Sequence, residues 1–133
     1  MLTINQIETA YKNIKSDVIR TPLITSDRLN QFLGFRLWVK CEMLQRTGSF
    51  KFRGACHAIS TLADDGAPIL AYSSGNHAQA IALNAFLSGR DATVIMPSDA
   101  PITKRQATAS FGANIHLYDR EKENREEIGN RLQ

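Results

Sequence analysis

The stretch from residue 69 to residue 97, ILAYSSGNHAQAIALNAFLSGRDATVIMP, decides the fold of this chain. Its apolar start (residues 69–72) and its β-branched end (residues 92–96) are typical of short buried strands. The segment between them, residues 78–87, is typical of a helix that ends at Ser88-Gly89. A strand, a helix and a strand in this order predict a right-handed crossover between parallel strands.

The same alternation continues on both sides of this stretch. Downstream, we expect a helix over residues 102–111, a strand over 113–118 and a helix over 120–132. Upstream, the alternating residues 35–42 predict a strand, and residues 49–63 predict a helix. The sequence therefore predicts an α/β fold of βαβ units around a parallel sheet, with ligands bound where strands run into helices.

Capping residues place the ends of several of these elements. Ser49 can cap the helix that we expect to stop at Asp64-Asp65-Gly66. Nearer the N-terminus, we expect a helix over residues 4–15 and a short one capped by Ser26 and closed by Gly34. In the strand at 35–42, Lys40 and Glu42 share a side and are expected to pair.

Composition excludes several classes of function. The 133 residues include 16 Lys and Arg and 13 Asp and Glu, and 43% of them are hydrophobic. Because the basic residues are scattered among acidic ones, we expect no nucleic-acid partner. No run reaches the roughly 18–20 apolar residues of a membrane span, and the first residues do not resemble a signal peptide. We therefore expect a cytoplasmic protein with no membrane partner.

Cysteine, histidine and glycine spacing narrows the choice further. Two cysteines, Cys41 and Cys56, without a signal peptide predict reduced thiols in the core. Because neither CxxC nor HxxxH spacing occurs among these and the histidines, we expect no metal site. The eight glycines include no Gly-Gly pair and no G-x-G, so a dinucleotide fingerprint and a P-loop are absent.

A polar loop at residues 45–53 carries Lys51. A lysine in the first turn of a helix lies at the positive end of the helix dipole, and Arg53 adds a second positive charge. Both effects favour the neutral amine, which can attack an aldehyde and form a Schiff base. Phe50 and Phe52 would favour it further by desolvation. The alternative is a solvent-facing lysine, which is the commoner case.

A second polar loop joins the strand at residues 69–72 to the following helix. The unpaired N–H groups at the start of that helix favour a carboxylate or a phosphate. Ser73, Ser74, Asn76 and His77 surround them. The alternative is a helix cap at Ser74 followed by a glycine turn, with His77 an ordinary core or surface residue.

These loops resemble those of one known family. Residues 40–55, KCEMLQRTGSFKFRGA, resemble the lysine motif of fold-type-II pyridoxal-phosphate enzymes, and residues 73–79, SSGNHAQ, resemble a second motif of the same enzymes. The similarity is greatest to the threonine dehydratase and serine racemase branch, and it covers essentially the whole chain. It implies a partial tryptophan-synthase-β-like architecture and pyridoxal 5'-phosphate as the cofactor.

The resemblance also implies roles for individual residues. Lys51 matches the lysine that joins the cofactor as a Schiff base and acts as a base, and Ser74 matches an acid/base serine. Phe50 matches a side chain packed against the pyridine ring, and Asn76 matches the partner of the ring hydroxyl. The implied substrate-binding residues are Ser73, Ser74, Asn76, His77 and Arg125, the last of which is otherwise typical of a solvated arginine in a charged helix.

The implied activity is that of a threonine or serine ammonia-lyase, which removes the β-hydroxyl of a small hydroxy amino acid and releases a 2-oxo acid and ammonia. A serine racemase or a hydroxyaspartate dehydratase is the alternative within the family, and a non-catalytic fragment or interaction module is the alternative outside it. Because the family's glycine-rich phosphate loop is missing, we expect a truncated chain whose isolated form binds cofactor weakly. Residues 1–65 would begin the larger domain and residues 66–133 form most of the smaller one, in a homo-oligomer at full length.

Overall fold

A three-stranded parallel sheet forms the centre of the molecule. The computed structural model describes residues 1–63 and 65–133. The strands are β3 (Ile69–Tyr72), β4 (Ala92–Pro97) and β5 (Asn114–Tyr118), in the order β3-β4-β5. Tyr72 pairs with Ile95, which in turn pairs with His116, so the carboxyl ends of all three strands meet at one edge. The predicted α/β fold with parallel βαβ units is confirmed.

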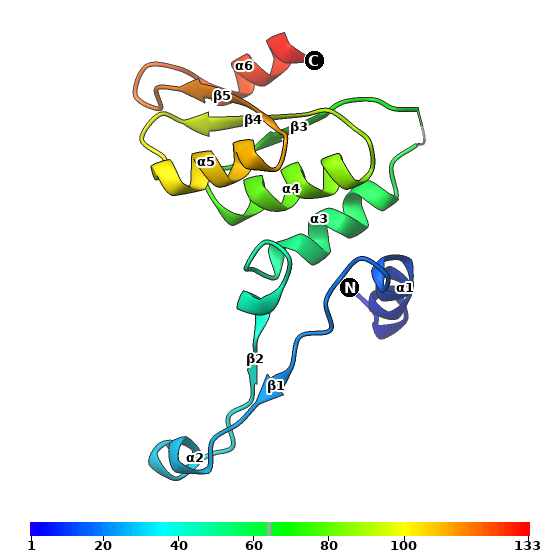
Figure 1. Ribbon diagram of the computed structural model, residues 1–133, viewed down its shortest axis with the longest axis vertical. Helices are drawn as coiled ribbons and strands as arrows, with labels where there is room; N and C mark the ends of the chain where they lie inside the picture. Colours follow the sequence, from blue (N-terminus) through cyan, green and yellow to red (C-terminus); the bar gives the residue numbers. More distant parts are fainter. Residues whose placement is uncertain (64) are drawn as a thin grey trace.

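Helices cover both faces of this sheet. Helices α4 (Asn76–Leu87) and α5 (Ile102–Ser110) lie on one face, and α6 (Arg125–Leu132) lies on the other (Figure 1). Alanines of α4 pack against β4 in a core that includes Val94 and Met96, neither of which is exposed. Small side chains let the helix approach the sheet closely.

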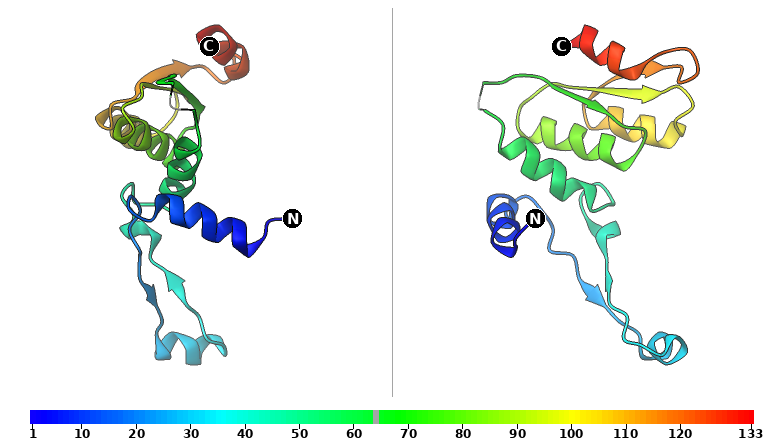
Figure 2. Two further views of the ribbon diagram at one scale, coloured as in Figure 1. Left: turned by 90° about the vertical axis from the view of Figure 1, so that its right-hand side faces the viewer. Right: turned by 180° about the vertical axis from the view of Figure 1, so that it is seen from behind.

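The N-terminal part is more extended. Helix α3 (Lys51–Ser60) packs between α4 and α1 (Ile4–Ile14). Before it, β1 (Leu23–Ile24), α2 (Asp27–Leu33) and β2 (Val39–Lys40) form a projection, called the arm below, that points away from the sheet (Figure 2). A 3-10 turn, η1 (Glu42–Leu44), joins the arm to α3. The two strands of the arm pair antiparallel.

Local caps form where the sequence indicates them. The side chain of Ser26 accepts a hydrogen bond from the Leu29 amide at the start of α2, and Gly34 ends that helix with a φ of 74°. Thr3 and Gln6 form a reciprocal capping box at the start of α1. Cys41 and Cys56 are both buried free thiols, as expected.

The strand predicted over residues 35–42 is wrong in length and in partner. Only Val39–Lys40 is a strand, and it pairs with β1 instead of joining the parallel sheet. Side chains of the arm form hydrogen bonds with the backbone groups that a neighbouring strand would otherwise bind. The Leu37 amide donates to Asn30 Oδ1 at 2.9 Å, and Thr25 Oγ1 donates to the Leu37 carbonyl at 2.7 Å.

The predicted pair between Lys40 and Glu42 is also wrong. The Lys40 ammonium donates to the Thr21 carbonyl at 2.6 Å. Glu42 pairs with Arg53 at 2.7 Å. Because Glu42 lies in the 3-10 turn and not in a strand, the two side chains do not share the face that strict alternation predicts.

Two predicted helices have different ends. Helix α3 begins after Phe50, with no side-chain cap, and ends at Ser60, so Ser49 does not cap it. Asp64, the first residue of the predicted stop, lies outside the described residues. Helix α6 begins only after Asn124, because the Asn124 side chain accepts hydrogen bonds from the amides of Glu126 and Glu127 and fixes its start there.

Candidate active site

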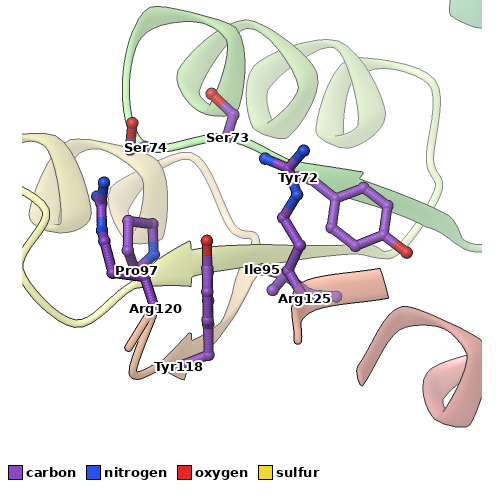
Figure 3. A pocket seen from close by; sticks show the side chains of 8 residues that line it. All are labelled: Tyr72, Ser73, Ser74, Ile95, Pro97, Tyr118, Arg120 and Arg125. Atoms are coloured by element: carbon purple, nitrogen blue, oxygen red, sulfur yellow. The ribbon is translucent and has the colours of Figure 1, made fainter. Parts of the chain in front are cut away.

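A small cavity of about 110 Å³ opens at the edge of the sheet where the three strands end. Its lining comes from the ends of the three strands, from the residues that follow β3 and β5, and from α6. It consists of Tyr72, Ser73, Ser74, Ile95, Pro97, Tyr118, Arg120 and Arg125. In Figure 3, the Arg125 side chain extends toward the loop that carries Ser73, and the Tyr118 hydroxyl points toward the same space. The structure thus brings together three of the predicted site residues.

The charge at this edge is positive. The Arg120 guanidinium is paired with Asp99 at 2.8 Å, but both side chains are more than half exposed. Arg125 has no carboxylate within ion-pair distance among the residues that the structure describes. Helix α4 also begins here, and its first amides carry the positive end of the helix dipole. The arrangement therefore favours an anionic ligand such as a carboxylate.

Ser73, and not Ser74, bonds the start of α4. Ser73 Oγ accepts hydrogen bonds from the amides of Gly75 at 3.3 Å and Ala78 at 3.1 Å. The alternative of a helix cap at Ser74 is therefore wrong. Because the Ser73 oxygen accepts both bonds, its own proton is left to donate to a ligand. The Ser74 side chain lines the cavity and is exposed there.

Lys51 is the first residue of α3, as predicted. It is exposed, and its Nζ lies 5.2 Å from the centre of the Phe50 ring, whose side chain is also exposed. Phe52, in contrast, is fully buried against Ile14 and Val18. The desolvation of Lys51 by flanking aromatics, expected from the sequence, is therefore not present in this chain.

Arg53 is not the unbalanced charge that the sequence indicates. Its guanidinium binds both oxygens of Glu42, at 2.7 and 2.9 Å, and also donates to the Ile19 carbonyl at 2.8 Å. The hydrogen bond from Arg53 holds the pKa of Glu42 below its ordinary value. The negative charge of Glu42 therefore opposes the field that Arg53 would otherwise exert on Lys51.

Two buried hydroxyls near Lys51 have no partner. Thr47 and Ser49 are each 7% exposed, and neither Thr47 Oγ1 nor Ser49 Oγ has a hydrogen-bond partner in the described chain. Gly48, between them, has a φ of 68°, which favours glycine and turns the chain sharply before α3. Buried unpaired hydroxyls cost free energy, so this turn is suited to a polar ligand.

Asn76 and His77 are the first two residues of α4. Burial lowers the pKa of His77 below its ordinary value, and the nearby charge of Lys51 lowers that pKa further. Asn76 Oδ1 accepts a hydrogen bond from the Lys104 ammonium. Neither Asn76 nor His77 lines the cavity with Ser73, Ser74 and Arg125.

The predicted residues thus form two adjacent groups. Lys51, Phe50, Asn76 and His77 lie around the starts of α3 and α4, outside the cavity lining. Sequence reasoning missed Tyr118 and Arg120 in the cavity, although both follow the third strand at the edge where ligands are expected. It also missed the contact of Lys104 with Asn76, which joins residues 28 positions apart and leaves no local pattern.

Two further properties concern the described chain as a whole. In the described residues, no three His, Cys, Asp or Glu side chains lie close enough to hold a metal ion. None of the helices that the structure describes has the length and apolar character needed to cross a membrane.

The fold and both motifs place the chain in one enzyme family. The family described as "Pyridoxal-phosphate dependent enzyme" matches residues 14–133. This match covers most of the length of the chain, and the chain therefore belongs to that pyridoxal-phosphate-dependent family. The recognition of fold-type-II motifs in the sequence is thereby confirmed.

Individual relatives agree with this assignment. The chain is 48% identical over 132 residues to an L-threo-3-hydroxyaspartate ammonia-lyase of Saccharomyces cerevisiae, covering 98% of this chain and 40% of the relative. It is 42% identical to a serine racemase of Schizosaccharomyces pombe, covering 98% of this chain and 41% of that protein. Both comparisons show that the chain spans about two fifths of the length of these relatives.

A solved structure has the same fold. The structure of maize serine racemase superimposes with a TM-score of 0.91 at 37% identity, over 98% of this chain and 40% of the maize chain. Because the agreement extends over nearly the whole chain, the arm, the sheet and its covering helices are all features of the fold-type-II architecture.

The residues present fit the aldehyde and ring end of the family's cofactor. Lys51 offers a primary amine at a helix start, with no carboxylate in ion-pair distance among the described residues. The unpartnered hydroxyls of Thr47 and Ser49 lie within four residues of this amine in the chain. Asn76 keeps its amide NH₂ group available as a donor, since its oxygen is bound to Lys104.

Proposed function

We propose that this chain carries the lysine-bearing part of the active site of a pyridoxal-phosphate-dependent ammonia-lyase for small hydroxy amino acids. The observation that carries the proposal is the position of Lys51 at the start of α3, where its charge lowers the pKa of His77 at the start of α4. An amine for the cofactor and an anion-binding edge for the substrate thus lie on neighbouring helices. Ammonia-lyase relatives with 48% and 52% identity support this choice.

Each residue has a role that follows from its bonds. Lys51 would hold the cofactor aldehyde and, once released from it, accept the proton from the substrate Cα. Phe50 would pack against the ring, and Asn76 would donate to the ring hydroxyl. When bound, the cofactor supplies an electron sink for the charge left on the substrate Cα.

The substrate carboxylate would be held at the start of α4. Ser73 would donate the hydroxyl proton that its backbone bonds leave free, and the amides of Asn76 and His77 would donate along the helix axis. The neutral imidazole favoured by the lowered pKa of His77 can donate one hydrogen bond without adding a charge. Arg125 would pair with the substrate from α6. Ser74 would move a proton, and if it returned one to Cα the outcome would be racemisation.

A hydroxyaspartate is the favoured substrate within this class. Two arginines, Arg120 and Arg125, line the cavity beside Ser73 and Ser74. A substrate with a second carboxylate would gain a charge-assisted hydrogen bond there that serine and threonine cannot make. The relative with 48% identity is named for L-threo-3-hydroxyaspartate. Cytoplasmic location, homo-oligomerisation and the division at residue 65 stay predictions.

Borohydride trapping tests the central claim. The chain is incubated with pyridoxal phosphate, reduced with borohydride and mapped by peptide mass. Lys51 is expected to carry the label, and Lys51→Ala to lose it, while Lys12→Ala in α1 keeps it. Labelling spread evenly over surface lysines would contradict the enzyme proposal and favour an interaction module.

The substrate is tested separately, in the protein at its natural length. We expect faster ammonia release from L-threo-3-hydroxyaspartate than from L-threonine or L-serine, and a loss of this preference in Arg120→Met. Equal rates on all three substrates would contradict the dicarboxylate preference. They would leave the ammonia-lyase reaction supported.

A further inference from the structure

Lys104 is a half-buried cation that the proposed chemistry does not use. It lies in the first turn of α5 and donates to Asn76 Oδ1 at the start of α4. No carboxylate lies within ion-pair distance of Lys104 in the part of the chain that the structure describes. The group that its ammonium binds is thus a neutral amide.

This position is unfavourable for a cation on stability grounds. The first turn of a helix carries the positive end of the dipole, and Lys104 lies close to two such turns, those of α4 and α5. Without a carboxylate nearby, these dipoles raise the free energy of the ammonium. An anionic oxygen bound beside it would offset that cost.

The hydrogen bond also fixes what Asn76 can do. An asparagine side chain has one acceptor oxygen and one donor NH₂ group. Because the oxygen is occupied by Lys104, the NH₂ group is the end left for a ligand. The side chain can therefore donate to a ligand oxygen, and a rotated amide that offered its oxygen would place two donors against each other.

We propose that Lys104 is a positioning residue, which holds Asn76 with its NH₂ group toward the ligand and selects an anionic acceptor oxygen there. The proposal rests on the proposed function, in which that oxygen is the ring hydroxyl of the cofactor. Lys104 acts through Asn76 and not by touching the reacting atoms. It couples α5 to the loop from which α4 begins.

The contact itself is tested in the chain without ligand. The side-chain NH₂ signals of Asn76 are compared by NMR in wild type, Lys104→Met and Lys104→Arg, with Lys12→Met as the matched control. We expect the signals to move in Lys104→Met and to stay near wild type in Lys104→Arg and Lys12→Met. Signals that do not move in Lys104→Met would overturn the contact.

The consequence is tested by trapping pyridoxal phosphate on Lys51 at limiting concentration. Loss of one charge-assisted hydrogen bond should lower the labelled fraction about tenfold in Lys104→Met. Lys104→Arg should keep labelling within about twofold, because it retains a cationic donor. In the Asn76→Ala background, Lys104→Met should change nothing further, since a residue that acts through Asn76 needs its amide.

The outcomes separate this proposal from the proposed function. Undiminished labelling in Lys104→Met, or an equal loss in the Asn76→Ala background, would overturn the positioning role while Lys51 labelling still supported the enzyme. If wild type labels no more than Lys51→Ala, the proposed function fails instead. The NMR comparison then decides on the Lys104–Asn76 contact alone.

Discussion

Apolar side chains are buried in the sheet and exposed in the arm. Val94 and Met96 of β4 are 0% exposed, whereas Phe32 of α2 is 86% exposed and Trp38 is 53% exposed. Figure 2 shows the arm standing clear of the helices that cover the sheet. The sheet is therefore held by packing, while the arm is held by hydrogen bonds and by the polar residues at its base.

The packed part of the molecule also holds the candidate site in place. The residues of the two polar loops start helices α3 and α4, whose inner faces are packed into the core. Lys51 is followed directly by Phe52, which is fully buried. The reactive amine is thus anchored by its neighbour, although it lies at the junction with the arm.

The largest expected effect separates two phenylalanines. Phe52→Ala should lower the free energy of unfolding by about 3–5 kcal/mol, because it leaves a cavity among Ile14, Val18 and Cys56. Phe32→Ala in the arm should change it by less than about 0.5 kcal/mol. Urea denaturation of both variants measures the difference. Similar losses for the two would show that the arm is packed in solution, contrary to this structure.

The next effect tests how closely α6 lies on the sheet. A Cβ at Gly129 would lie 1.6 Å from the Tyr72 hydroxyl, so Gly129→Ala must displace the tyrosine or the helix that carries Arg125. We expect a loss of about 1–3 kcal/mol in urea denaturation. At Gly54 in α3 an added Cβ meets nothing within 4 Å, so Gly54→Ala should be neutral or stabilising by up to about 1 kcal/mol. A neutral Gly129→Ala would show that α6 is loosely held.

A smaller loss is expected at the polar base of the arm. Glu42→Gln should cost about 1–2 kcal/mol, because it weakens the bonds that Glu42 forms with Arg53 and Thr21. Asp99→Asn, which disturbs the exposed pair with Arg120, is the control and should cost less than about 0.5 kcal/mol. Chemical denaturation at pH 7 measures the free energy of unfolding of both variants. Equal losses would mean that the Glu42–Arg53 pair stabilises the fold no more than the exposed Asp99–Arg120 pair does.

The same pair predicts a dependence on pH. The folded pKa of Glu42 lies below the ordinary value of 4.5, chiefly because of its hydrogen bond with Arg53. The contribution is therefore complete above pH 4.5 and is lost as the pH falls through the lower folded pKa. As the pH is lowered from neutral through this range, stability should fall less in Glu42→Gln than in wild type. Parallel curves would show that the pair contributes nothing.

Local signals predicted the sheet well and the arm poorly. Strands 69–72 and 92–96 were predictable because buried parallel strands read as short apolar runs between turns. The prediction of a strand at 35–42 is wrong because the alternation does not show what binds the backbone. The Leu37 amide and carbonyl are bound by the side chains of Asn30 and Thr25 and not by a neighbouring strand. Which group satisfies a backbone amide is decided by tertiary contacts that the local pattern does not contain.

In the candidate site, too, local features were predictable from the sequence and long-range contacts were not. Lys51 and the serine loop were predictable from position, since helix starts define them. The binding of Arg53 to Glu42 and of Lys104 to Asn76 was not, because each joins residues far apart in sequence. The helix at 120–132 started late because Asn124, an ordinary polar residue in a charged run, caps it.

The smallest expected effect lies where α3 and α4 meet. Partial burial, and secondarily the charge of Lys51, lowers the pKa of His77 below 6.5. The unfolded chain therefore binds the proton more readily, and this group lowers stability as the pH falls through 6.5 toward the folded pKa. An NMR titration should give a His77 pKa below 6.5 that rises only part of the way back in Lys51→Met, because burial is the larger cause. The same His77 pKa in Lys51→Met as in wild type would place Lys51 too far from His77 to act on it. It would then remove the link between the two halves of the proposed site.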